Sequence, residues 1–167
     1  MCKHLQWTSD FKCIHCHAFI TTESIFSGVR NRNHCPYCLW SKHLDLHQAG
    51  DRLSACKAGM QPVGLTLKKT WKKYGIHEGG ELMIIHQCTG CGSISINRIA
   101  ADDGAERIFE IYEGSLKSGD NNRAGLQECG VIALGPRDRE IVFTRLFGLD
   151  HCCLDRVPAL LCTCEDF

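Results

Sequence analysis

Residues 32–38 read RNHCPYC, and the two cysteines of this stretch decide the fold. A Cys-x-x-Cys pair occurs both in dithiol redox enzymes and in metal-binding turns. The redox use requires a buried strand before the first cysteine and a helix whose N-terminus lowers the thiol pKa. Because polar, turn-forming residues precede Cys35 (GVRNRNH, 28–34), we predict a metal-binding turn. Thiol redox chemistry through Cys35 and Cys38 is the alternative.

A second Cys-x-x-Cys pair, upstream of the first, supports the metal-binding interpretation. Cys13 and Cys16 precede Cys35 and Cys38, with 18 residues between the two pairs. This spacing is typical of structural zinc sites, in which four thiolates surround the ion tetrahedrally. The sequence therefore predicts a four-cysteine zinc site. Pro36 fixes φ in the second turn and has no N–H to place.

A third pair, Cys88 and Cys91, predicts a second zinc site. Gly90 and Gly92 are expected to supply the positive φ that turns backbone N–H groups toward the sulfurs. Cys56 is the natural third ligand. For the fourth we favour His43 over His86, and Cys2, His4, His47 or solvent remain open. We interpret His15, His17 and His77 as surface or hydrogen-bonding residues.

Several segments in order carry a family resemblance: RNHCPYCLWSKHLD (32–45), GDRLSAC (50–56), QPVGL (61–65), CTGCG (88–92) and NRIAADD (97–103). Over about residues 11–117 the chain resembles the RNHCP-domain family of small bacterial proteins. The resemblance implies a zinc-ribbon-like fold with zinc ligands, but it implies no reaction. The extension from about residue 118 goes beyond the short members of the family.

Composition limits the possible compartments and divides the chain. The 167 residues include 13 cysteines, but the N-terminus shows no signal peptide and no apolar run could span a membrane. We therefore expect a soluble, cytoplasmic protein. Residues 1–100 carry 12 Lys or Arg against 6 Asp or Glu, and residues 101–167 carry 7 against 13. The predicted units are a basic zinc-ribbon module (1–101), an amphipathic helix (102–117) and an acidic extension (118–167).

Strands are predicted at 62–69, 81–87 and 93–99, with Val63, Leu65 and Leu67 on one face. Between the first two strands, cations alternate with aromatic rings, a composition typical of loops that bind RNA or single strands. A solvated hairpin is the alternative interpretation. The candidate nucleic-acid residues are Arg30, Arg32, Lys68, Lys69, Trp71, Lys72, Lys73 and Tyr74.

Residues 102–117 predict a helix capped by Asp103, with Glu106 at the third position and an apolar face that covers the ribbon. The apolar face consists of Ala105, Ile108, Phe109, Tyr112 and Leu116. The opposite, acidic face consists of Glu106, Glu110 and Glu113. Beyond it we predict a loop at 115–125, a strand at 128–134 and a helix from Pro136 onward. Cys129 is interpreted as core. A third metal site from Cys152, Cys153, Cys162 and Cys164 is a weaker hypothesis than free thiols.

The predicted fold class is a small α+β protein with zinc-ribbon-like hairpins, two structural zinc ions, a covering helix and a mixed C-terminal extension. Cysteine-rich zinc shells are normally closed, and the sequence contains no catalytic motif such as GxSxG or HExxH. We therefore expect a non-catalytic protein that binds RNA or a ribosomal particle, with no small-molecule substrate and no membrane partner. A protein-interaction adaptor is the second hypothesis, and a metal-dependent or thiol enzyme is the third.

Overall fold

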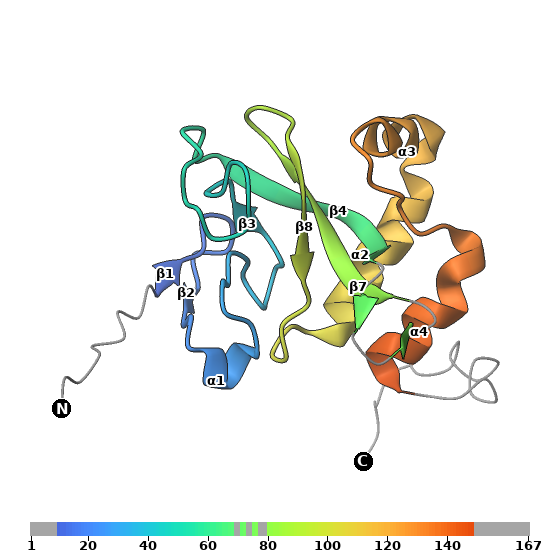
Figure 1. Cartoon of the computed structure of the whole chain (residues 1–167), viewed down its shortest axis with the longest axis horizontal. Helices are drawn as coiled ribbons and strands as arrows, with labels where there is room; N and C mark the ends of the chain where they lie inside the picture. Colours follow the sequence, from blue (N-terminus) through green and yellow to red (C-terminus); the bar gives the residue numbers. More distant parts are fainter. Residues whose placement is uncertain (1–9, 69–70, 73–74, 77–79, 149–167) are drawn as a thin grey trace, which may run out of the picture.

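A curled antiparallel sheet lies between a cysteine-rich half and a helical half in the computed structural model of the chain (Figure 1). The structure describes residues 10–68, 71–72, 75–76 and 80–148. The sheet has the strand order β3-β4-β7-β8. Its strands are β3 (Ser41–Lys42), β4 (Gly59–Lys68), β7 (Glu81–Cys88) and β8 (Ile94–Arg98). The three strands predicted from the sequence are confirmed, with bounds shifted by at most three residues.

The two long strands pair along almost their whole length. Met60 lies opposite Cys88 and Lys68 opposite Glu81, with one irregularity between Pro62 and Gly64. Leu65, Leu67 and Ile84 point to the helical side, where they belong to or pack on the main core. The alternation of Leu65 and Leu67 in β4 and the apolar run of β7 therefore place one face of the sheet against helices.

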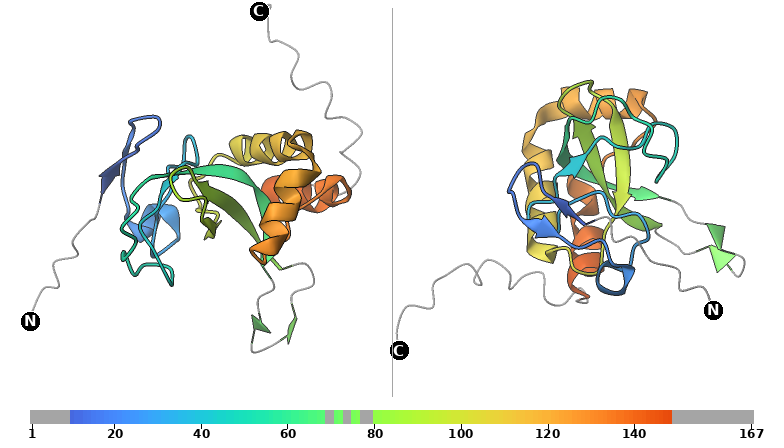
Figure 2. Two further views of the ribbon diagram at one scale, coloured as in Figure 1. Left: turned by 90° about the horizontal axis from the view of Figure 1, so that it is seen from above. Right: turned by 90° about the vertical axis from the view of Figure 1, so that its left-hand side faces the viewer.

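Two small hairpins flank the sheet. β1 (Phe11–Lys12) pairs with β2 (Phe19–Ile20), and the short helix α1 (Ser24–Ser27) follows. β5 (Trp71–Lys72) pairs with β6 (Gly75–Ile76), and Figure 2 shows this pair away from the rest of the molecule. The residues between β4 and β5 and much of the remaining hairpin lie outside the described ranges.

Helix α2 (Ala105–Lys117) packs on β4 and covers the sheet as predicted. Ile108 and Tyr112 are buried, and Phe109 and Leu116 pack against the core. The predicted cap is wrong, because Gly104 precedes the helix and makes no side-chain cap. The Asp103 carboxylate bonds elsewhere, as described below.

The extension is more helical than the sequence predicts. Residues 115–125 do not form a loop, because α2 continues to Lys117 and α3 (Gly119–Glu128) follows. The 3-10 helix η1 (Pro136–Asp138) and α4 (Arg139–Phe147) confirm the helix predicted from Pro136. Leu134 and Val142 join Leu65 and Ile84 in one core, so the extension completes the apolar interior.

Two further predictions for the extension are wrong. The predicted strand at 128–134 is irregular, although the Leu134 N–H donates to the Leu65 carbonyl and Thr66 Oγ1 donates to the Ile132 carbonyl. These two bonds hold the segment beside β4 without a ladder. Cys129 is exposed, not core, because it follows the last turn of α3. In the described part of the chain, no helix is long and apolar enough to cross a membrane.

Candidate metal centres

The three Cys-x-x-Cys turns, which we call the first, second and third knuckles in chain order, have the same backbone conformation. In each, the residue after the second cysteine has positive φ: His17 at 63°, Leu39 at 60° and Gly92 at 75°. The N–H of that residue donates to the carbonyl of the first cysteine, at 2.8 to 3.1 Å. The N–H of the first cysteine donates to the carbonyl of the residue two positions after the second cysteine. That residue is Ala18, Trp40 or Ser93. This geometry brings both thiols of a turn to one side.

The first two turns meet and form a four-thiol cluster. Cys13 Sγ lies 3.5 Å from Cys38 Sγ, and Cys16 Sγ lies 3.5 Å from Cys35 Sγ. All four sulfurs lie within 4.8 Å of one another. Tetrahedral zinc with Zn–S bonds of about 2.3 Å requires sulfurs about 3.8 Å apart. The cluster therefore fits a structural zinc ion, as the spacing predicts.

The second cluster places His43 where a fourth ligand would bind. His43 Nδ1 lies 3.3 Å from Cys91 Sγ, and Cys56 Sγ lies 3.6 Å from Cys88 Sγ. The ligand atoms of these four residues again lie within 4.8 Å of one another. Cys88 and Cys91 form the turn between β7 and β8, while His43 follows β3. The His43 N–H donates to the Ala58 carbonyl, which holds the histidine beside the segment that carries Cys56.

His86 is not a ligand, because both of its ring nitrogens bond to other groups. Nε2 donates to the Leu39 carbonyl at 2.7 Å, and Nδ1 accepts from Asn97 Nδ2 at 2.9 Å. The ring is fully buried, and burial lowers its pKa to about 4. His86 therefore links β7 to the second knuckle as a neutral hydrogen-bonding residue.

The role predicted for Gly90 requires correction. Gly92 has positive φ, but Gly90 does not. A Cβ on Gly90 would lie 2.8 Å from Ala58 Cβ and 3.2 Å from Cys56 Sγ. Gly90 therefore lets the third turn approach the Cys56 segment closely. Lys57, which follows Cys56, also has positive φ (53°), like the residue that follows the second cysteine of each knuckle.

Hydrogen bonds lower the pKa of some of the cysteine thiols, whereas burial raises the pKa of others. The Ala18 N–H lowers the pKa of Cys16 to about 7, and the Ser93 hydroxyl lowers the pKa of Cys91 to about 6. Burial raises the pKa of Cys35 to about 11 and raises that of Cys38 further. Zinc binds thiolates, so its charge must drive the proton from the buried thiols, and metal binding is coupled to proton release.

The family comparison identifies the chain. The family described as RNHCP domain matches residues 8–109. The chain belongs to the RNHCP domain family. The RNHCP match contains all eight ligands of both clusters and ends within α2, so it leaves α3 and α4 outside. Searches of curated proteins and of solved structures found no match.

The first three residues of the RNHCP motif connect the knuckles to the helix. Arg32 Nη2 lies 3.0 Å from Asp103 Oδ1, and Arg32 Nη1 lies 2.5 Å from Asp102 Oδ2. His34 Nε2 donates to Asp103 Oδ2 at 2.8 Å. Asn33 Nδ2 donates to Asp45 Oδ2 at 2.9 Å. The motif therefore joins the second knuckle to the residues just before α2 and to the loop after β3.

This network corrects one predicted nucleic-acid residue. Arg32 is only 1% exposed, so its guanidinium is not available to a phosphate. Arg30 and Lys68 are exposed, as a nucleic-acid contact requires. Trp71 and Lys72 form β5, and their side chains, like Lys69, Lys73 and Tyr74, lie outside what the structure describes. The same holds for Cys2, His4, His77 and the four tail cysteines.

Sequence reasoning missed a groove beside the first knuckle of the RNHCP domain. It has a volume of about 170 Å³ and is lined by Trp40 together with Lys12, Lys42 and Arg52. His15 stacks on the Trp40 ring, with centroids 4.4 Å apart and planes within 8°. We call this site the basic groove. Its cations are far apart in the sequence, so no local motif indicates it.

Proposed function

We propose that this protein is a non-catalytic, zinc-stabilised module that binds RNA, alone or on a ribosomal particle, in a reducing compartment such as the cytoplasm. The observation that carries the proposal is the basic groove. Three exposed cations, Lys12, Lys42 and Arg52, line it together with an indole ring, and no acidic side chain is among its described lining residues. Cations that neutralise phosphates beside a ring that can stack on a base are what single-stranded RNA requires.

The carboxylates near the groove are engaged by the backbone. Asp45 accepts from the Gly50 and Arg52 N–H groups, and Asp51 accepts from Leu46, His47, Gln48 and Leu53. These bonds hold the loop after β3, and they hold the pKa of Asp51 well below its usual range. The carboxylates therefore shape the loop that carries Arg52.

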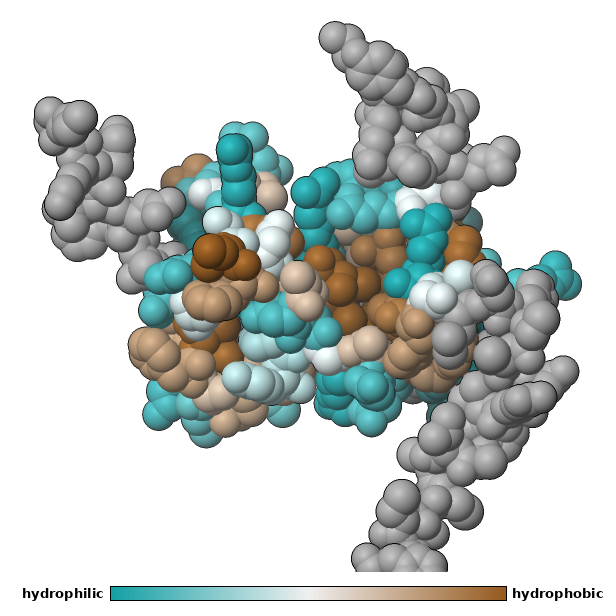
Figure 3. Space-filling view, turned by 90° about the horizontal axis from the view of Figure 1, so that it is seen from below, coloured by the Kyte–Doolittle hydropathy of each residue, from teal (hydrophilic) through white to brown (hydrophobic). Residues whose placement is uncertain are grey.

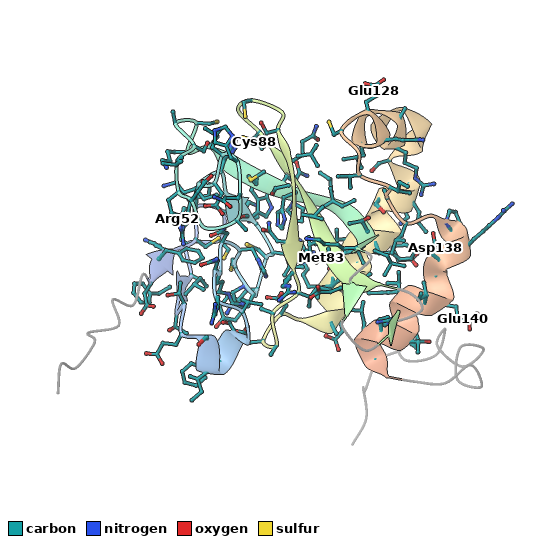
Figure 4. All side chains as sticks on the ribbon, viewed as in Figure 1. Arg52, Met83, Cys88, Glu128, Asp138 and Glu140 are labelled. Atoms are coloured by element: carbon teal, nitrogen blue, oxygen red, sulfur yellow. The ribbon has the colours of Figure 1, made fainter. Side chains whose placement is uncertain are left out.

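Charge is also separated across the molecule. Figure 4 shows Arg52 on the knuckle side, whereas Glu128, Asp138 and Glu140 lie on the helical side. A nucleic acid would therefore approach the knuckle side, where residues 10–68 carry 7 Lys or Arg against 4 Asp or Glu. Lys68 and the hairpin beyond it, with Lys69, Lys72 and Lys73, form a second candidate contact.

The test is binding of a labelled poly(U) oligonucleotide at increasing salt. Changing Lys12, Lys42 and Arg52 together to Ala should weaken binding, and should flatten the salt slope by about 2 because each single-strand phosphate contact contributes about 0.7. A matched control changes Arg107, Lys117 and Arg137 to Ala, because these three exposed cations lie on the helical side. Undetectable binding at low salt, or equal losses in both triple variants, would contradict the proposal.

Each other part of the proposal has its own test. Changing Lys68, Lys69, Lys72 and Lys73 to Ala measures the hairpin separately from the groove. Co-sedimentation with ribosomal particles tests the ribosomal form. Deletion of residues 118–167 would not isolate the effect of their acidic charge on RNA binding, because Leu134 and Val142 belong to the shared core.

A protein-interaction adaptor is the second candidate, and a specific surface favours it. Phe19 is 73% exposed, Ile25 is 83% exposed and Phe26 is 59% exposed. Figure 3 shows apolar side chains among polar ones on the face seen from below, the side of α1 in Figure 1. Exposed apolar clusters often mark protein contacts. The adaptor hypothesis would be favoured if the parent chain bound no RNA, and if a protein that co-purifies with the parent chain were lost from the Ile25→Ser variant.

A further inference from the structure

A cavity of about 170 Å³ lies between the zinc-binding sheet and the extension. Val63 and Ile94 contribute from the sheet, and Leu126 and Ala133 contribute from α3 and the segment after it. Gln87 and Gly92, which are next to Cys88 and Cys91, also line it. The lining therefore contains sequence neighbours of two ligands but none of the ligands themselves, and neither the zinc sites nor the proposed RNA contact uses the cavity.

One charged group lines this cavity. Arg123, from α3, is the cation among the described residues of its lining, and none of those residues is a carboxylate. Arg123 Nη2 is buried and has no hydrogen-bond partner among the described residues. A buried donor without a partner is costly, and in folded proteins such a group usually marks a bound water or ion.

Among the described residues, Arg123 has no ion-pair partner. No carboxylate of the described chain lies within ion-pairing distance of the guanidinium. Asp138 is nearby, since a Cβ on Gly135 would lie 3.5 Å from Arg123 Nη1 and 3.8 Å from Asp138 Oδ2. However, Asp138 Oδ2 accepts the Gly135 N–H at 2.7 Å, which holds it on the η1 turn.

The two serine hydroxyls at the cavity are already used as donors. Ser115 Oγ donates to the Tyr112 carbonyl at 2.6 Å, and Ser118 Oγ donates to the Gly114 carbonyl at 3.2 Å. Arg123 is therefore the group that selects the charge of a ligand. The apolar residues of the lining favour a ligand whose remaining part is apolar. A cavity of this size accommodates a molecule as large as benzene.

We propose that this cavity binds a small monocarboxylate with an apolar body, its carboxylate on Arg123 and its body between Val63, Ile94 and Leu126. A guanidinium bonds a carboxylate with two parallel N–H groups, which supplies the acceptor that Nη2 lacks. The ligand would contact both the RNHCP domain and the extension. The extension thereby acquires a binding role independent of RNA.

The test is a thermal unfolding series of the full zinc-loaded chain with benzoate, benzamide and inorganic phosphate as probes. Benzoate should raise the Tm in proportion to the logarithm of its concentration once that exceeds the Kd, by roughly 5–10 °C at roughly 100 times the Kd. Benzamide has the same shape without the charge, and phosphate has the charge without the apolar body. Both should give a much smaller rise. An equal rise with either probe, or no rise with benzoate, would overturn the proposal.

Two variants locate the site. Arg123→Gln should abolish the benzoate effect, and Arg137→Gln, an exposed arginine of the extension, should preserve it. If Arg123→Gln does not fold, titration of benzoate into the unmodified protein, followed by NMR, gives the answer. The Arg123 side-chain Nε–H signal should then shift, and a shift confined to other arginines would contradict the assignment.

Discussion

Arg32 and Asp103 are 71 positions apart in the sequence and form an ion pair in which neither side chain is exposed. Breaking a buried pair leaves an unpaired charge, so Arg32→Ala should lower the free energy of unfolding by about 3–5 kcal/mol. Urea unfolding at saturating zinc measures it. Arg107→Ala, which breaks the exposed pair with Glu110, should cost less than about 1 kcal/mol. Similar costs for the two variants would show that the buried pair is not structural.

The assignment of His43 predicts different results for two histidine variants. His43→Ala should remove one zinc ion per chain and leave the other, because it deletes a ligand of one cluster. His86→Ala should keep both ions but destabilise the fold, because the Leu39 carbonyl loses its donor. Zinc content by elemental analysis, with unfolding curves, distinguishes the two. Loss of zinc from the His86 variant alone would reverse the assignment.

Gly90→Ala should weaken the second zinc site selectively. Its added Cβ meets Ala58 Cβ and Cys56 Sγ at distances that require the turn to move. Competition with a chromogenic chelator should show one ion released more readily than in the parent chain. The control is Gly114→Ala in α2, where nothing lies within 4 Å of the new Cβ. That variant should hold both ions and gain about 0.5–1 kcal/mol of stability, because Ala favours helix.

Tyr112 should make stability fall at high pH. Burial raises the pKa of its hydroxyl, which donates to the Gly135 carbonyl at 2.6 Å. The folded state favours the neutral phenol, so this contribution is complete below the unfolded pKa of about 10 and declines as pH rises above it. Unfolding curves around that pH should show a steeper decline for the parent chain than for Tyr112→Phe. Parallel declines would contradict a titration at Tyr112.

The sequence predicted the parts of the fold that local patterns determine. Cysteine spacing indicated both clusters, the alternation of β4 and the apolar run of β7 indicated the long strands, and the helical pattern indicated α2. The choice of His43 also followed from sequence position, since His86 is too close to Cys88 on one strand. These features depend on spacing and periodicity, which are visible without coordinates.

The remaining features depend on contacts between distant segments. Nothing near Asp103 indicates that Arg32 and His34 take its carboxylate away from the helix cap. Polar composition suggested a loop at 115–125, but burial of Leu126 stabilises α3 against its weak helix propensity. The basic groove and the Arg123 cavity assemble from residues that are not adjacent in the sequence.

The central claim is that two closed zinc sites organise this RNHCP domain, one with four sulfurs and one with three sulfurs and His43 Nδ1. Native mass spectrometry combined with zinc X-ray absorption tests it most directly. The account predicts two zinc ions per chain, and an average shell dominated by sulfur at about 2.3 Å with a minor nitrogen component near 2.0 Å. A folded chain with no zinc or with a single ion, or a shell rich in oxygen, would contradict it.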